Sequence, residues 1–511
     1  MTIHRSAITI DQSSFTHPDF NHALNSVIQV GMIASFIFFL VVFLVVGLLS
    51  ARVRKNTRKD YYLAGLGLKP WLVGLSAMAT NLSGYMFIGL IGFTHEVGLS
   101  SIWLMFGWII GDLLVSLFIH RPLREQTESQ KQLSYAGVLA NWHGQDYWYV
   151  QKIAALLLIF LLMSYASAQM LAGSKALLAL LEWPLEIGVI VSAIMIALYC
   201  WAGGIRASVW TDAAQAIVMV IAMTIMLWIG FDNQGGLANA MHKWREIDGY
   251  MAWFPKETLI PGAFGATVFA IGWFFGGISI IGQPHIMIRF MMLDNVTHFI
   301  RARVWYYTWY TVFYALAVAV GMLSRLIMPD MGGFNDAELA LPLIAQELLP
   351  PVLAGVVLAG LFAATMSTAD SLVLSASSAI TQDLKDKGIQ DMRYVKGTTI
   401  IVTLAALLFA LHGSESVFAV VMFAWSGLGS SFAPLLIVYV LGGRPTQAMA
   451  VTMMCGGLSV AILWRYLEWQ NHIYEGLPGI LTGLLIFAAW AGGKHLLHLA
   501  EREKPAKNGS R

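Results

Sequence analysis

The sequence predicts an all-α integral membrane protein, and three observations support this fold class. Of 511 residues, 58% are hydrophobic and only 12% are charged, and the mean hydropathy is +0.67. Apolar stretches close to the ~20 residues that a helix needs to cross the hydrocarbon recur along nearly the whole chain. The two cysteines, Cys200 and Cys455, both lie in apolar segments. This composition excludes an ordinary soluble protein, a disulfide framework and a cysteine-rich metal site.

Charged and Pro/Gly-rich breaks divide the apolar sequence into about thirteen expected membrane spans. We expect residues 1–25 to form an extracytoplasmic tail, 26–495 the transmembrane domain and 496–511 a cytoplasmic tail. The first apolar run has full membrane length, so it is expected to stay as a helix and not to be cleaved as a signal peptide. The expected spans are 26–51, 69–94, 98–120, 150–176, 183–202, 207–230, 262–290, 302–328, 342–380, 396–412, 416–441, 446–466 and 474–495.

The positive charges predict the orientation, because Lys and Arg accumulate in cytoplasmic loops. They gather after the first, third, seventh and ninth spans and at the end of the chain. With an odd number of spans, all these clusters lie on one side if the N-terminus is outside and the C-terminus is cytoplasmic. The protein is thus expected as a multi-pass protein of the cell (inner) membrane. The clusters are Arg52, Arg54, Lys55, Arg58 and Lys59; Arg121, Arg124 and Lys131; Arg289, Arg301 and Arg303; Lys385, Lys387, Arg393 and Lys396; and Lys494, Arg502, Lys504, Lys507 and Arg511.

Two spans contain polar, Gly and Pro interruptions that ordinary membrane helices avoid. Residues 78–84 (MATNLSG) interrupt the second span, and 276–285 (GGISIIGQPH) interrupt the seventh. Freed backbone groups are tolerated at membrane depth only where they line a cavity or protein, and paired interrupted helices indicate a transporter's midplane site. The spacing of five spans predicts two inverted units of five helices, at about 69–230 and 262–441.

A polar patch lies within the apolar ninth span. Ala364, Ser367, Thr368 and Ser371 are spaced i, i+3, i+4 and i+7, so on a helix their backbone and side-chain oxygens form one stripe. Oxygen atoms are the ligands that hard cations prefer, which favours Na⁺ as the guest. The alternative is helix packing, because small hydroxyl residues line many membrane helix interfaces. Roles for Asp112 and Asp370, two further acids within the spans, stay open.

Five segments, in order along most of the chain, resemble motifs of the sodium/solute symporter family, and most of all those of its sodium/proline branch. They are 61–65 (YYLAG), 203–215 (GGIRASVWTDAAQ), 282–290 (GQPHIMIRF), 366–371 (MSTADS) with 376–383 (ASSAITQD), and 425–429 (WSGLG). The resemblance implies a five-plus-five inverted-repeat (LeuT-like) fold and Na⁺-driven uptake of a solute by alternating access.

The resemblance also implies site residues. The Na⁺ ligands would be the carbonyls of Ala79, Leu82 and Ala364 and the hydroxyls of Ser367 and Thr368. Asp212 would lie near a second cation or proton route beside Ser367 and Ser371. Asp370 joins this second site as a candidate ligand, and the alternatives for it are a polar partner or a protonated carboxyl group. The implied solute contacts are Asn81, Ser83, Gly84, Tyr85, Tyr165, Gln169 and Gln283.

The sequence departs from the proline branch at four positions. Asn81 stands where that branch carries Asp, Leu66 where it carries Arg, and Gly276 and Ile280 where it carries Trp and Tyr. The resemblance implies an amino acid such as proline as the solute, and these departures keep a carboxylate or another small nutrient open as the alternative.

An enzyme and a solute sensor are the two alternatives to a transporter. HExxH and GxSxG motifs and Cys/His clusters, which would indicate an enzyme, do not occur, and the tail after residue 495 is too short for a signalling domain of a solute sensor. The expected partners are a small solute, Na⁺ and the lipid bilayer. Neither nucleic acid nor an obligatory protein partner is expected.

Overall fold

The computed structural model describes residues 18–50, 52, 55, 57–255, 258, 260–330, 336–385, 388–413 and 416–502. In this part of the chain the regular structure is helical, and eleven helical segments are long and apolar enough to cross a membrane. The predicted integral membrane fold is confirmed, whereas the count of about thirteen spans stays a prediction. The expected tails, 1–25 and 496–511, lie largely outside the described residues.

The helices are α1 (Pro18–Ser50), α2 (Arg58–Leu63), α3 (Pro70–Phe87), α4 (Gly89–Val97), α5 (Ile102–Phe118), α6 (His120–Ser129), α7 (Tyr135–Ala140), α8 (Trp148–Leu181), α9 (Leu185–Gly203), α10 (Ile205–Asn233), α11 (Leu237–Glu246), α12 (Ala263–Ile278), η5 (Ser279–Gly282), α13 (Pro284–Met291), α14 (Phe299–Ile327), η8 (Ala337–Leu339), α15 (Ala340–Leu348), α16 (Pro351–Ser378), η9 (Ala379–Asp383), α17 (Met392–His412), α18 (Val417–Val440), α19 (Gln447–Tyr466) and α20 (Gly476–Arg502).

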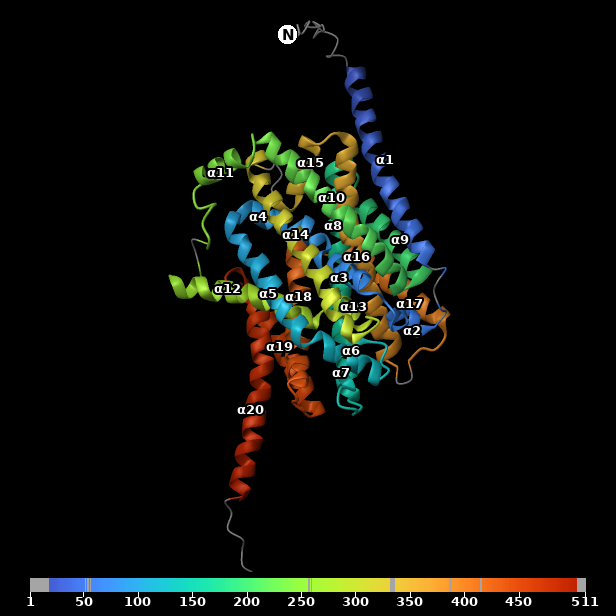
Figure 1. Cartoon of the computed structure of the whole chain (residues 1–511), viewed down its shortest axis with the longest axis vertical. Helices are drawn as coiled ribbons and strands as arrows, with labels where there is room; N and C mark the ends of the chain where they lie inside the picture. The colour runs from blue at the N-terminus through green and yellow to red at the C-terminus, as the bar shows by residue number, and fades with distance from the viewer. Residues whose placement is uncertain are drawn as a thin grey trace, which may run out of the picture.

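Helix α16 forms the centre of the bundle. It packs against α1, α3, α8 and α10, and its residues from Val357 to Ser378 are buried throughout. In Figure 1, α1 and α20 extend beyond the bundle at opposite ends, and α15 and α11 lie at the end opposite to α6 and α7. The hydroxyl-rich patch of the ninth span is therefore enclosed by protein on all sides and does not face lipid.

The second span is interrupted, and the break lies at Ser83. This residue adopts φ 51° and ψ 175°, a conformation that a side chain makes costly, and α4 starts anew at Gly89. The next residue, Gly84, has no room for a side chain, because a Cβ there would lie 2.5 Å from Thr365 Cγ2 on α16. Strain at Ser83 and close approach at Gly84 thus bring the break directly against α16.

The seventh span is interrupted in the same way. Helix α12 ends at Ile278, the short η5 follows, and α13 begins at Pro284 after the non-helical Gln283. Proline is favourable there because it stands at the first position of a helix, where its missing N–H is not needed. A Cβ on Gly282 would lie 2.2 Å from the carbonyl oxygen of Leu428, so glycine lets η5 contact α18 closely.

The expected ninth span begins too early in the sequence. The ninth span was expected at 342–380, but residues 340–348 form the separate α15, and α16 begins at Pro351. The reason is the Pro350–Pro351 pair, since a proline biases the residue before it away from helical backbone angles. Pro350 indeed has an extended ψ of 148°.

Candidate functional site

The break in α3 meets the polar stripe of α16 through backbone and hydroxyl oxygens. The Ser367 hydroxyl lies 3.0 Å from the carbonyl oxygen of Ala79 and 3.0 Å from that of Ala364. One turn along, the Thr368 hydroxyl donates to the carbonyl oxygen of Thr80 at 2.8 Å. All these residues are buried. Two hydroxyls and three carbonyls from two helices therefore lie together within the membrane-spanning region. Lipid offers such polar groups no hydrogen-bond partners, so they pair with one another.

Four of the five residues implied as Na⁺ ligands are thus close together in space. Ala79, Ala364, Ser367 and Thr368 lie at the α3–α16 contact, and the fifth, Leu82, is buried on the same segment of α3. The hydroxyls of Ser367 and Thr368 donate their hydrogen bonds to backbone carbonyl oxygens. A hydroxyl can rotate to direct a lone pair at a cation instead, since it is both donor and acceptor. The arrangement is chemically suited to a hard monovalent cation.

A charged cluster lies on the same face of α16, next to the oxygen-rich contact. Asp212 on α10 accepts hydrogen bonds through Oδ2 from the Ser76 hydroxyl at 2.5 Å and from Thr80 at 3.4 Å. The same oxygen forms an ion pair with Arg289 Nη2 at 3.2 Å. Asp370 Oδ1 accepts from Ser208 and Ser371, both at 2.9 Å. The implied second-site residues Asp212, Asp370 and Ser371 are therefore neighbours in the fold.

Arg289 was assigned to a cytoplasmic loop from its position near a span end, and this assignment is wrong. Its side chain is fully buried on α13 and donates to Ser76, Ser208 and Ser371, as well as to the carbonyl oxygen of His285. Its position shortly after the GQPH segment does not reveal these partners. Arg289, Ser76 and Ser208 are site residues that sequence reasoning missed, because only the packing of α3, α10, α13 and α16 brings them together.

A small central cavity lies beside the break in α3. It measures about 10 Å³ and is lined by Asn81, Tyr85, Met86, Trp108, Tyr165, Tyr314, Val421 and Trp425. Three of the implied solute contacts, Asn81, Tyr85 and Tyr165, are among them. Trp108, Tyr314 and Trp425 were not singled out from the sequence, since aromatic residues in membrane spans more often serve in packing or at the interface.

The other implied solute contacts surround this cavity without lining it. The Tyr165 hydroxyl lies 3.5 Å from Ser83 Oγ, and Gln169 Oε1 accepts from the freed backbone N–H of Gly84 at 2.8 Å. Gln283 donates to the carbonyl oxygens of Ser279 and Trp425. Gln283 therefore joins η5 to the helix that carries a cavity-lining ring.

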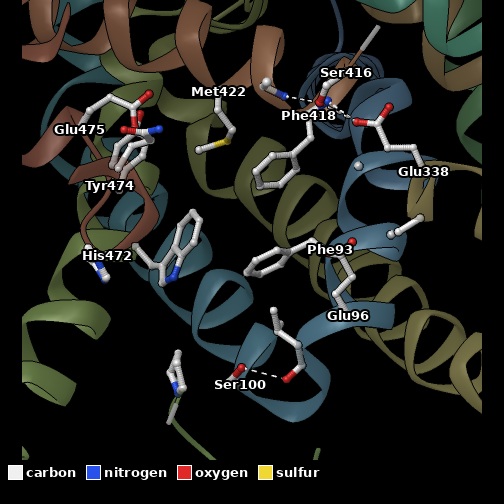
Figure 2. A pocket seen from close by; sticks show the side chains of 18 of the residues that line it. Phe93, Glu96, Ser100, Glu338, Ser416, Phe418, Met422, His472, Tyr474 and Glu475 are labelled. Carbon is white, nitrogen blue, oxygen red and sulfur yellow. Dashed lines mark hydrogen bonds between the residues drawn. The ribbon is translucent and has the colours of Figure 1, made fainter. Parts of the chain in front are cut away.

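A much larger vestibule of about 760 Å³ leads toward the cavity. Its lining includes Glu96, Lys175, Asp336, Glu338, Arg465 and Glu475 together with Phe93, Trp273, Phe418 and Tyr474. Figure 2 shows the Phe93 and Phe418 rings within it, which stack with centroids 5.6 Å apart. The vestibule is lined by η8, the start of α18, α12 and the α19–α20 connection, so it extends from the α15 end of the molecule toward α12 and the start of α20 (Figure 1).

Aromatic rings separate the vestibule from the central cavity. Phe418 of the vestibule stacks on Tyr85 of the cavity at 5.6 Å between centroids, and Trp273 of the vestibule stacks on Trp108 of the cavity at 6.3 Å. A small solute could pass only if these rings move. Toward α6 and α7, in contrast, side-chain bonds close the bundle: Tyr135 donates to the carbonyl oxygen of Ile281, and Ser134 donates to Asp383 at 2.6 Å.

Comparison with known proteins agrees with this geometry. Residues 61–457 match the sodium:solute symporter family. The chain is 29% identical to the sodium/proline symporter of Escherichia coli (strain K12), over 89% of this chain and 92% of that protein. It is 28% identical to the high-affinity proline transporter PutP of Bacillus subtilis (strain 168), over 84% of this chain and 92% of that protein.

A solved structure shares the fold. It is the substrate-bound, outward-open state of a Na⁺-coupled sialic acid symporter, with a TM-score of 0.75 and 19% sequence identity over 90% of this chain and 98% of that one. The LeuT-like fold and Na⁺ as the coupling ion, both implied by the motifs, are confirmed. With a family match over most of its length, the chain belongs to the sodium:solute symporter family.

Proposed function

We propose that this protein imports an amino acid of the size of proline, driven by Na⁺ bound between α3 and α16. The observation that carries the proposal is the oxygen cluster of Ala79, Ala364, Ser367 and Thr368 at the break in α3. Na⁺ there would take the place of the hydroxyl-to-carbonyl hydrogen bonds and tie α3 to α16. The assigned activity is transport and not catalysis, as it is for the relatives.

Coupling follows from the position of the oxygen cluster next to the cavity. Asn81 of the cavity wall lies between Thr80 and Leu82 on the same interrupted segment. A cation that fixes this segment also fixes the cavity wall, so solute affinity rises when Na⁺ is bound. Binding free energies couple reciprocally, so the solute must strengthen Na⁺ binding by the same factor.

Asp212, Asp370 and Ser371 are proposed as a second cation or proton site. Arg289 pairs directly with Asp212, whereas Asp370 is linked to Arg289 through the hydroxyls of Ser208 and Ser371. The cluster therefore carries an excess acid if both carboxylates are ionised. A further monovalent cation or proton would balance that charge in a region where an unpaired charge is costly.

Alternating access would use the two interrupted helices and the aromatic layer. The repeats are proposed at about 69–230 and 262–441, which begin with α3–α4 and α12–α13. The vestibule is proposed to open outward, with the N-terminus outside and the C-terminus cytoplasmic. Supporting this, the basic segments at α6 and at the start of α17 lie away from the α15 end of the bundle (Figure 1). Labelling of single cysteines placed in α6 and η8 of a cysteine-free protein would test this orientation.

Proline is supported by the sodium/proline symporter relatives and by an aromatic ring beside position 276. A Cβ on Gly276 would lie 3.2 Å from the Trp108 ring, and Trp425 Nε1 donates to the carbonyl oxygen of Gly276 at 2.9 Å. Trp108 thus fills space beside position 276 and also lines the cavity. The apolar walls suit the ring of proline better than a second charged group.

Thermal unfolding of the purified protein against a solute panel tests the proposal. Amino acids and organic acids are compared in NaCl and in KCl at equal ionic strength. A ligand at 100 times its Kd stabilises the folded protein by about 2.7 kcal/mol. Proline should therefore raise the unfolding temperature in NaCl and much less in KCl. A protein stabilised equally in both salts, or by organic acids alone, would contradict it.

A further inference from the structure

Asp112 is a buried carboxylate that the proposed function leaves unused. It lies on α5, one turn after the cavity-lining Trp108, and is completely buried. Its oxygens accept from the hydroxyls of Tyr306 at 2.5 Å and Tyr307 at 3.0 Å, and from Asn81 Nδ2 at 3.4 Å. Among the described residues, these neutral donors are its hydrogen-bond partners and no basic side chain pairs with it. A carboxylate at membrane depth without a counter-charge is costly, so its presence indicates a functional role.

The carboxylate sets the direction of a chain of hydrogen bonds that ends at the cavity. A tyrosine hydroxyl has one hydrogen, and an ionised carboxylate only accepts, so Tyr306 must donate to Asp112. The lone pairs of Tyr306 then accept from Asn81 Nδ2, which also faces Asp112. Among the described residues, both hydrogen bonds of the Asn81 side chain use Nδ2, which leaves Oδ1 as the acceptor atom of this cavity-lining residue.

The vestibule and the central cavity together form the route of the solute, and this route offers no unpaired lysine or arginine side chain among the described lining residues. The residues that line the central cavity include no charged side chain. The described lining of the vestibule has four acids, Glu96, Asp336, Glu338 and Glu475, against the lysine Lys175, the arginine Arg465 and one histidine, His472. The lysine and the arginine are already paired: Lys175 Nζ lies 2.6 Å from Asp336 and 2.7 Å from Glu338, and Arg465 Nη1 lies 2.7 Å from Glu475. Figure 2 shows Glu338, Glu475 and Glu96 around its space. An acidic route favours a solute with a positive group.

We propose that Asp112 is a specificity-determining residue that directs this transporter to solutes with a protonated primary or secondary amine. Through Tyr306 it holds the Asn81 oxygen toward the cavity, where that oxygen accepts an N–H from the ammonium group. Its own negative charge lies directly behind and balances the solute's positive charge. This inference rests on the proposed Na⁺-coupled uptake and adds the chemical group that the site recognises.

Two adjacent tyrosines provide a matched test, because both donate to the same carboxylate and only Tyr306 also contacts Asn81. Binding of L-proline, N,N-dimethyl-L-proline and cyclopentanecarboxylate is measured in saturating Na⁺ for the wild type, Asp112→Asn, Tyr306→Phe and Tyr307→Phe. The dimethyl compound has a positive nitrogen without N–H, and cyclopentanecarboxylate has no nitrogen. The wild type should bind proline best.

Loss of a hydrogen bond to a charged group predicts that Asp112→Asn weakens proline binding by at least about tenfold. Tyr306→Phe should weaken it severalfold, because Asn81 can still donate to Asp112 directly. Tyr307→Phe should stay within about twofold. In Asp112→Asn the preference for proline over the other two compounds should also shrink, which loss of a merely structural contact would not cause. Na⁺-dependent thermal stabilisation of each variant verifies folding.

Equal effects of the two tyrosine variants, or unchanged selectivity in Asp112→Asn, would overturn the inference while leaving Na⁺-coupled uptake intact. A shift in Na⁺ requirement without a change in selectivity would instead place Asp112 in a cation site. If the wild type binds cyclopentanecarboxylate as tightly as proline in a Na⁺-dependent manner, the inference fails and coupled uptake stands. If no solute in the panel binds in a Na⁺-dependent manner, the proposed function itself fails.

Discussion

Replacing Ser367 by alanine tests the proposed Na⁺ site at one atom. The Ser367 hydroxyl is the only side-chain group in this contact that lies 3.0 Å from carbonyl oxygens of both α3 and α16 among the described residues. Hydrogen bonds and contacts to charged groups contribute about 1.5–3 kcal/mol each. Since about 1.4 kcal/mol corresponds to tenfold, Ser367→Ala should weaken Na⁺ binding by about 10- to 150-fold.

The assay is solute uptake into proteoliposomes as a function of external Na⁺ at fixed membrane potential. The half-saturating Na⁺ concentration should rise by that factor, whereas the maximal rate at saturating Na⁺ should fall much less. Ser431→Ala is the matched control, because Ser431 is a buried serine whose hydroxyl donates to Gly427 within its own helix at 2.7 Å. A Ser367→Ala protein with the same Na⁺ requirement as the Ser431→Ala control would refute the site.

Three further predictions concern the residues around the site. Arg289→Met leaves Asp212 buried without its ion-pair partner and should destabilise the protein by about 3–5 kcal/mol; the double variant with Asp212→Asn should recover part of the loss in thermal unfolding, and an additive loss would contradict this. Gly84→Ala places a Cβ 2.5 Å from Thr365 Cγ2 and should abolish Na⁺-dependent solute binding, whereas Gly67→Ala, which meets no atom within 4 Å, should bind normally. Glu338→Gln weakens the ion pair with Lys175 and the hydrogen bonds that cap the N–H groups of Val417 and Phe418 at the start of α18. The free energy of unfolding should fall by about 1–2 kcal/mol. An unchanged unfolding temperature would show that these contacts do not stabilise α18.

The sequence predicted the elements whose signal is local. Hydropathy located most helices within a few residues, and the glycines and polar residues of 78–84 and 276–285 predicted both interruptions. It did not predict that the first break lies at Ser83, because a positive φ at a serine depends on the tertiary contacts that enforce it. The Pro350–Pro351 pair was a local signal for the start of α16 that the hydropathy reading passed over.

The candidate site was predictable where one helix carries the pattern and not where several helices meet. The stripe of Ala364, Ser367 and Thr368 follows from helical spacing alone. Arg289 looks like a topology signal in the sequence, because its partners Asp212 and Ser208 lie on another helix about 80 residues earlier. Asp112 could be recognised as an intramembrane acid, but its link to the cavity through Tyr306 requires the packing of α3, α5 and α14.

Accumulation of labelled proline in proteoliposomes tests the central claim most directly. Vesicles are loaded with K⁺ and diluted into Na⁺ medium or into K⁺ medium, with the membrane potential clamped. Na⁺-coupled import predicts internal proline above the external concentration with an inward Na⁺ gradient, and mere equilibration without it. Equal uptake in the two media, or accumulation that follows a proton gradient and ignores Na⁺, would contradict the account.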